Sequence, residues 1–145
     1  MAEAIARDLG GPRVEPFSAG SHPAGYIHPL AEATMQSMGI SIAGQFSKSW
    51  DMFEDQEIDV IITLCDHAAD QPCPAWPGRP ATAHWGFADP AALDAPEPER
   101  LAFARHVAET LKTSIQGLLD LDRSGLSPEE LQRRVQDLGP NDESR

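Results

Sequence analysis

Residues 60–64 constrain the fold more than any other segment, because they form an uninterrupted run of apolar and β-branched side chains, Val-Ile-Ile-Thr-Leu. Such a run is typical of a strand buried on both faces, as found in parallel sheets covered by helices. Strand-like segments at 14–17 and 83–87 alternate with helical patterns along the chain. The sequence therefore predicts one α/β fold with three layers, in which helices cover both faces of a mostly parallel sheet.

Two helical patterns lie in the first third of the chain. Residues 1–9 place apolar side chains on one face and end at a Gly-Gly pair, but their start has no Ser, Thr, Asp or Asn cap. Residues 29–38 begin at Pro29 and stop at Gly39, which is the usual distribution of these residues in helices.

Two further helices are expected in the second half of the chain. Asp94 precedes Glu97 by three residues, as in a capping box, and an apolar stripe follows. Ser127 and Glu130 form a second such signature, ahead of a helix that ends at a Gly-Pro pair. The inward-facing residues are expected to be Phe103, Val107, Leu111, Ile115 and Leu118 in one helix, and Leu131, Val135 and Leu138 in the other.

The chain of 145 residues is acidic: 11 Lys and Arg stand against 23 Asp and Glu, a formal net charge of -12. This argues against non-specific nucleic-acid binding, which needs basic residues to displace counterions from phosphates. Any bound anion must therefore be held by local backbone dipoles. The sequence contains no stretch with the length of a membrane span and no recognisable signal peptide, so we expect a cytoplasmic protein with neither nucleic acid nor membrane as partner.

The chain contains two cysteines, Cys65 directly after the 60–64 strand and Cys73 eight positions later. Functional groups in open parallel sheets gather beyond the carboxyl ends of the strands, which is where Cys65 would lie. Cys73 is in a loop that could fold back toward it. The alternative is that Cys65 is a small buried hydrophobe and Cys73 an incidental surface thiol, and spacing alone does not decide between them.

Asp89 and Pro90 follow the Trp-Gly-Phe triplet at the end of the 83–87 strand. An aspartate against aromatic side chains can have a raised pKa and deliver a proton to a leaving group. The alternative is an Asp-Pro turn without a chemical role.

Two other patterns are weaker. Cys65, His67, Cys73 and His84 have the residue types of a zinc site, but the spacing lacks the paired short loops of such sites. Cys73 and Arg79 match the Cys-x5-Arg loop of tyrosine phosphatases, which binds an oxyanion with backbone N–H groups. Prolines remove two of those donors and no helix is expected to start there, so the match is coincidental.

Seven short motifs occur in order: Met1-Ala-Glu-Ala, Ser18-Ala-Gly, Gly39-Ile-Ser-Ile-Ala-Gly-Gln, Ser47-Lys-Ser, Ile62-Thr-Leu-Cys-Asp-His-Ala, Cys73-Pro and His84-Trp-Gly-Phe-Ala-Asp-Pro90. Together they resemble the thioredoxin-coupled arsenate reductases built on the low-molecular-weight tyrosine phosphatase fold. The resemblance covers about residues 1–120, and its last two motifs are the specific ones. It implies a domain at 1–122, followed at 123–145 by an extra helix and a polar tail.

The resemblance also implies roles. A cysteine in an N-terminal loop attacks arsenate, and the residue matching Cys65 attacks the thiol–arsenate adduct. The residue matching Cys73 resolves the resulting disulfide and presents the new bridge between Cys65 and Cys73 to thioredoxin. The residue matching Asp89 protonates the leaving oxygen. No bound cofactor is implied. A dithiol supplies the two electrons that arsenate reduction needs, so the cysteines favour a reductase over a phosphatase.

The sequence departs from that pattern in three places. The family's first, central strand and its Cys-x5-Arg loop do not occur in these residues, and Pro72 lengthens the loop between the cysteines by one residue. Lys48 stands where some members have an acidic potassium ligand, near the matches to two other ligands, Glu3 and Ser18. Its ammonium would replace the cation, so we expect no potassium requirement.

These departures leave three hypotheses open. The uncapped first helix suggests that Met1 is an internal methionine of a longer reading frame for an arsenate reductase, and that the 145 residues alone are inactive. A second hypothesis is an inactive family member that acts as a binding module. A third is a phosphatase for phosphotyrosine or small phosphoesters.

Overall fold

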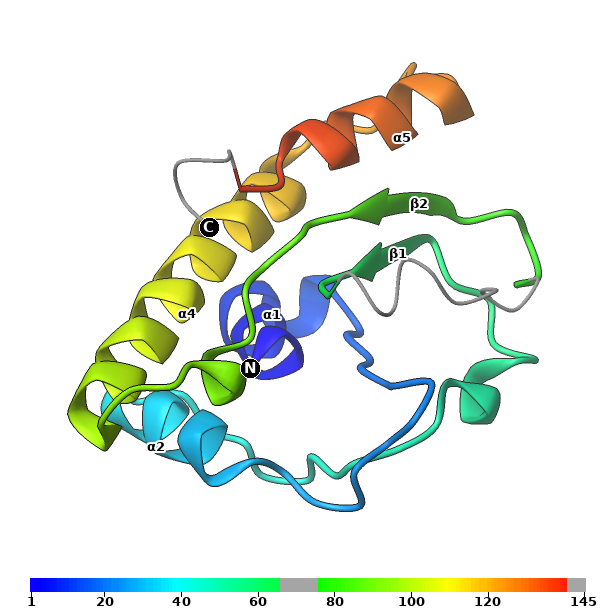
Figure 1. Cartoon of the computed structure of the whole chain (residues 1–145). Coiled ribbons are helices and arrows are strands. Elements are labelled where there is room, and N and C mark those ends of the chain that lie inside the picture. The colour runs from blue at the N-terminus through cyan, green and yellow to red at the C-terminus, as the bar shows by residue number, and fades with distance from the viewer. Residues whose placement is uncertain (66–75, 141–145) are drawn as a thin grey trace.

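A computed structural model describes residues 1–65 and 76–140 (Figure 1). Helices surround a small sheet of two parallel strands, in which Val60 pairs with Ala81 and Thr63 with His84. The elements are α1 (Ala2–Gly10), η1 (Gly11–Arg13), α2 (Pro29–Ser37), η2 (Trp50–Phe53), β1 (Val60–Thr63), β2 (Ala81–His84), η3 (Pro90–Ala92), α4 (Glu97–Asp120) and α5 (Pro128–Asp137). The α/β class and the parallel strand order are those expected from the sequence.

All four expected helices are present as α1, α2, α4 and α5. In α1 the N-cap position is Met1, which makes no side-chain capping bond, and the helix ends at Gly11 with a φ of 52°. A positive φ of this size is open to glycine at little cost. The accompanying ψ of -129° lies outside the left-handed helical region, so Gly11 ends the helix without the left-handed cap that glycine commonly forms there.

The two predicted capping boxes had different outcomes. Ser127 is the N-cap of α5, and its Oγ accepts a hydrogen bond of 3.1 Å from the N–H of Glu130, as expected. The box at Asp94 is wrong, because the N-cap of α4 is Pro96 and no side chain of the described residues caps this helix. Asp94 lies two residues too early to reach the first free N–H groups of α4.

The strand predictions need three corrections. The strand expected at 83–87 lies earlier, at β2, and residues 14–17 form no strand with any part of the chain that the structure describes, although Val14 is extended. The segment at 60–64 does form β1, but its four residues are half-buried rather than enclosed on both faces. The second and third corrections have one cause: within residues 1–65 and 76–140, β1 pairs with β2 alone, and 14–17 have no strand beside them.

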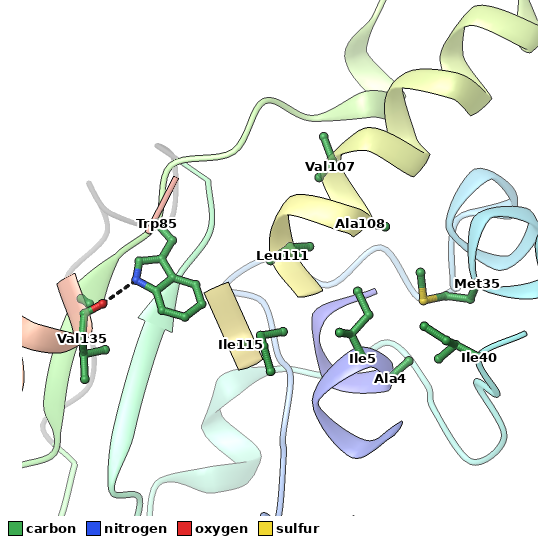
Figure 2. Packing of buried hydrophobic residues seen from close by; sticks show 11 residues of the cluster. Ala4, Ile5, Met35, Ile40, Trp85, Val107, Ala108, Leu111, Ile115 and Val135 are labelled. Carbon is green, nitrogen blue, oxygen red and sulfur yellow. Dashed lines mark hydrogen bonds between the residues drawn. The ribbon is translucent and has the colours of Figure 1, made fainter. Parts of the chain in front are cut away.

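The core lies along α4, whose inner face packs against both α1 and α2. Figure 2 shows Leu111 and Ile115 between Trp85 on one side and Ile5 on the other. The indole of Trp85 is 1% exposed, and its Nε1 donates to the carbonyl of Val135 in α5 at 2.8 Å. The fully or nearly buried residues of this cluster are Ala4, Ile5, Met35, Ile40, Ala83, Trp85, Val107, Ala108, Leu111, Ile115 and Val135.

The stripes predicted for α4 and α5 are confirmed in part. Val107, Leu111, Ile115 and Val135 are buried, whereas Phe103, Leu118, Leu131 and Leu138 are half-buried against the same cluster. Among the described helices, none is both long and apolar enough to cross a bilayer.

Candidate functional site

The carboxyl ends of β1 and β2 are joined beyond the last paired residues of the sheet. The N–H of Trp85 donates to the carbonyl of Thr63 at 2.8 Å, and the N–H of Phe87 donates to the carbonyl of Leu64 at 2.8 Å. Across the strands, Nδ1 of His84 lies 2.8 Å from Oγ1 of Thr63. Both strands therefore finish at the same end of the sheet. The predicted site residues Cys65 and Asp89 follow the strands at this end.

Cys65 comes directly after this joined segment, and its side chain is exposed with a free thiol. The alternative that Cys65 is a small buried hydrophobe is therefore wrong. Cys73 and His67 lie outside the described residues, so the structure does not place them relative to Cys65.

Asp89 follows the joined segment on the β2 side and is also exposed. Its Oδ1 accepts a hydrogen bond of 2.9 Å from the N–H of Ala91, which makes Asp89 the N-cap of η3. The Asp-Pro turn is thus confirmed, while the proton-donor role stays a prediction. Arg100 of α4 fixes this turn, because its Nη2 donates to the carbonyl of Ala91 at 3.3 Å.

The described residues do not test the zinc alternative, because His67 and Cys73 of the proposed set lie outside them. Cys65 and His84 are the two members of the proposed set that the structure describes, and no cluster of three or more His, Cys, Asp or Glu side chains suited to a metal occurs in the described ranges. Arg79 has a φ of 50° and leads into β2 rather than into a helix, as the rejection of the phosphatase-loop match requires.

A second polar centre surrounds the carboxylate of Glu3, which is 7% exposed. Nζ of Lys48 lies 3.2 Å from its Oε2, Nη2 of Arg7 lies 2.7 Å from its Oε1, and Oγ of Ser18 donates to Oε2. Nζ of Lys48 also donates to the carbonyl of Phe46 at 3.2 Å. The expected position of the Lys48 ammonium, beside Glu3 and Ser18, is confirmed.

The local backbone explains why these groups meet. The N–H of Gly20 donates to the carbonyl of Lys48 at 3.0 Å, and the N–H of Trp50 donates to the carbonyl of Gly20 at 3.2 Å. This isolated parallel bridge holds the turn that carries Ser18 against the segment that carries Lys48. The first turn of α1 supplies Glu3.

Burial would raise the pKa of Glu3, since it disfavours the charged carboxylate. The hydrogen bonds from Ser18 and Lys48, the positive charge of Lys48 and the hydrogen bond from Arg7 outweigh that effect. The pKa of Glu3 is therefore lower than its ordinary value, and the carboxylate stays charged at neutral pH.

Sequence reasoning missed the contact between Thr63 and His84 and the part that Phe46 plays through its carbonyl. The contact between Thr63 and His84 could have been predicted, because both are polar residues at the ends of neighbouring strands. The role of the Phe46 carbonyl could not have been predicted, since any residue type can supply a backbone carbonyl.

Comparison with known proteins agrees with this architecture. The model of the family "Low molecular weight phosphotyrosine protein phosphatase" matches residues 1–137, a range that reaches the last residue of α5. A curated arsenate reductase of Halalkalibacterium halodurans is 36% identical over 116 residues, which are 80% of this chain and 82% of the relative.

Solved structures give the same result. One described as an arsenate reductase in the oxidised state has a TM-score of 0.66 and 30% identity, and the match covers 81% of this chain and 84% of that one. A thioredoxin-dependent arsenate reductase of Corynebacterium glutamicum has a TM-score of 0.54 and 29% identity over 79% of this chain and 54% of its own. The chain therefore belongs to the low molecular weight phosphotyrosine protein phosphatase family of enzymes, together with relatives that are arsenate reductases.

Proposed function

We propose that this chain reduces arsenate to arsenite, for arsenic detoxification, through a relay of cysteine thiols that includes Cys65 and Cys73. In the overall reaction, one arsenic acid and two thiols give one arsenous acid, one disulfide and one water, so arsenic gains the electron pair that the two sulfurs lose. The observation that carries the proposal is the exposed thiol of Cys65 at the joined carboxyl ends of β1 and β2.

The relay proceeds in three steps. A first thiol displaces water from arsenate and forms a thiol–arsenate adduct. The thiolate of Cys65 attacks the sulfur of this adduct, the sulfur–arsenic bond breaks with its electron pair on arsenic, and arsenite leaves. The thiol of Cys73 then attacks the new disulfide at Cys65, which releases the first thiol and leaves a disulfide between Cys65 and Cys73.

Asp89 has the proposed role of proton donor to the oxygen that leaves as water. The position of Asp89 after β2 supports this role. The hydrogen bond from the N–H of Phe87 to the carbonyl of Leu64 ties the segment that leads to Asp89 to the segment that leads to Cys65. An exposed carboxyl group can exchange its proton with solvent between turnovers, and general acids of this kind typically contribute about 10²–10⁴-fold to a rate.

Thioredoxin is the proposed electron donor. Its dithiol reduces the disulfide between Cys65 and Cys73, so both thiols return and thioredoxin leaves as a disulfide. The thioredoxin dependence of the relative from Corynebacterium glutamicum supports this choice. Because the relay needs reduced thiols, a reducing compartment such as the cytoplasm is the proposed location.

The first thiol of the relay has no counterpart among the two cysteines of these residues. We therefore expect the 145 residues alone to release no arsenite. The test joins them to an N-terminal segment with the strand and Cys-x5-Arg loop that the family resemblance implies, and measures arsenite release with thioredoxin present. Release by the joined chain, and none by the 145 residues, is the expected result.

Three variants of the joined chain make this test specific. Cys65→Ser and Cys73→Ser should each stop multiple turnovers, and Asp89→Asn should slow them. If the joined chain folds and binds arsenate but releases arsenite equally well without Cys65 and Cys73, the relay is refuted.

Phosphomonoester hydrolysis is the second candidate, favoured by the description of the family model. Ester hydrolysis needs no electron pair and therefore no dithiol. Hydrolysis of a phosphotyrosine analogue by the joined chain that survives replacement of Cys65 and Cys73 would favour it.

A further inference from the structure

α5 lies along the edge of β2 that faces away from β1 (Figure 1). One side chain of α5 makes two hydrogen bonds with the backbone of that edge. Oε1 of Gln136 accepts from the N–H of His84 at 2.9 Å, and Nε2 of Gln136 donates to the carbonyl of His84 at 2.7 Å. The carboxamide thus satisfies the two groups that a neighbouring strand would satisfy, in the place where β2 ends.

A second contact fixes the next residue of the same segment. Nε1 of Trp85 donates to the carbonyl of Val135, the residue before Gln136 in α5 (Figure 2). The backbone of Gly139 packs closely against the same ring: a Cβ on Gly139 would lie 2.6 Å from Cδ1 of Trp85. Three hydrogen bonds from two consecutive residues of α5 therefore hold His84 and Trp85.

The opposite edge of this segment carries the contacts to β1. The N–H groups of Trp85 and Phe87 donate to the carbonyls of Thr63 and Leu64, respectively, and these two hydrogen bonds are called the ladder below. Alternate peptide groups of an extended strand point to opposite sides, so the bonds to α5 and the bonds to β1 do not compete. The end of β2 is held from both sides immediately before the chain continues to Asp89.

Gln136 itself is exposed and has no part in the apolar core. A helix surface position of this kind accepts most polar residues, so the propensity of α5 does not require glutamine here. The comparable residue one turn earlier, Gln132, reaches only the side chain of Thr82, at 3.5 Å between the two oxygens. The paired backbone bonds are specific to Gln136 within the described part of α5.

We propose that Gln136 is a positioning residue, which holds the carboxyl end of β2 so that Asp89 and Cys65 keep a fixed relation to each other. This rests on the proposed function, since those two residues are its reacting groups. The effect is indirect, because the Gln136 side chain bonds to the backbone of His84 and not to a reacting group. The hydrogen bonds of Trp85 and Phe87 then pass the restraint to Leu64, next to Cys65.

The test compares Gln136→Met with Gln132→Met in the full 145-residue chain. Both variants replace the same side chain, on the same helix, with an apolar side chain of similar length. Amide hydrogen exchange at Trp85 and Phe87 reports the ladder, and the rate at which an oxidant closes the disulfide between Cys65 and Cys73 reports the position of the thiol.

For Gln136→Met we expect exchange at Trp85 and Phe87 to rise by roughly tenfold and disulfide closure to slow by roughly tenfold, the scale set by one or two lost hydrogen bonds. Alkylation of Cys65 by iodoacetamide, measured with Cys73→Ser, should change less than about twofold because this thiol is already exposed. Gln132→Met should match the original chain in all three measurements. Should Gln136→Met fail to fold, Gln136→Asn keeps a carboxamide that is one methylene too short and should give the same pattern.

Equal exchange at Trp85 and Phe87 in Gln136→Met and Gln132→Met would overturn the positioning role. Faster exchange with unchanged closure would also overturn it, because the ladder would then not control Cys65. If the original chain forms no disulfide between Cys65 and Cys73, the proposed function fails, and the exchange result alone decides whether Gln136 orders the ladder.

Discussion

Nζ of Lys48 lies 3.2 Å from Oε2 of Glu3, and both side chains are more than nine-tenths buried. The pair joins the first turn of α1 to a segment 45 residues away in the sequence. Its surroundings are those of a cation site: a carboxylate, a backbone carbonyl and a hydroxyl that shares the carboxylate oxygen. Here the cation is part of the protein.

Removing this ammonium should destabilise the fold. Lys48→Met keeps most of the aliphatic stem but leaves the Glu3 carboxylate buried with Arg7 and Ser18 as its remaining partners. We expect a loss of about 3 kcal/mol in the free energy of unfolding, measured with urea. The control is Arg105→Ala, which breaks an exposed pair with Glu109 and should cost less than about 1 kcal/mol. Equal losses in the two variants would contradict the account.

Replacing Lys48 by an acidic residue should create a potassium response, which we predict the original chain to lack. Lys48→Asp removes the internal cation and adds a carboxylate near Glu3, so K+ can bind in its place. Exchanging choline chloride for KCl at equal ionic strength should leave the melting temperature of the original chain unchanged. The variant should gain about 1.4 kcal/mol once K+ reaches about ten times its Kd. A potassium response of the original chain would refute the replacement of the cation by Lys48.

The lowered pKa of Glu3 gives a pH dependence of known sign. A carboxylate with a lower pKa in the folded chain stabilises it fully above the unfolded pKa, near 4.5, and this stability is lost as pH falls through the folded value. The difference in unfolding free energy between the original chain and Glu3→Gln should therefore be largest above pH 4.5 and shrink below it. Urea titrations at several pH values measure this, and a difference that grows toward acid would contradict the assignment.

The cap of α5 should be worth a measurable amount of stability. Ser127→Ala removes the bond from the N–H of Glu130 and should cost about 1 kcal/mol. Asp94→Ala, at the box that the structure does not form, should change stability by less than about 0.5 kcal/mol. If Asp94→Ala costs as much as Ser127→Ala, then Asp94 caps α4 in solution and the assignment of its N-cap to Pro96 fails.

Features that depend on local sequence could be predicted. The four helices follow from apolar periodicity and from Gly, Pro and Ser at their ends, and the place of Cys65 follows from the β-branched run before it. The ion pair between Lys48 and Glu3 could also be predicted, from the family resemblance, which places those positions together.

Features that depend on a distant partner could not be predicted. Val14 and Phe17 are residue types that favour strands, yet a strand exists only where another strand bonds to it. The contact from Gln136 to His84 joins residues 52 apart, through a side chain on the polar face of a helix. Nothing in the pattern of α5 distinguishes Gln136 from Gln132, because only the path of β2 brings a backbone edge within reach.

We propose that Cys65 and Cys73 form a dithiol that exchanges an electron pair with thioredoxin. The most direct measurement oxidises the 145-residue chain with diamide and then adds thioredoxin, thioredoxin reductase and NADPH. We predict an intramolecular disulfide, consumption of one NADPH per chain and recovery of two free thiols, all absent in Cys65→Ser. A chain that forms no such disulfide, or one that dithiothreitol reduces and thioredoxin does not, would contradict the claim.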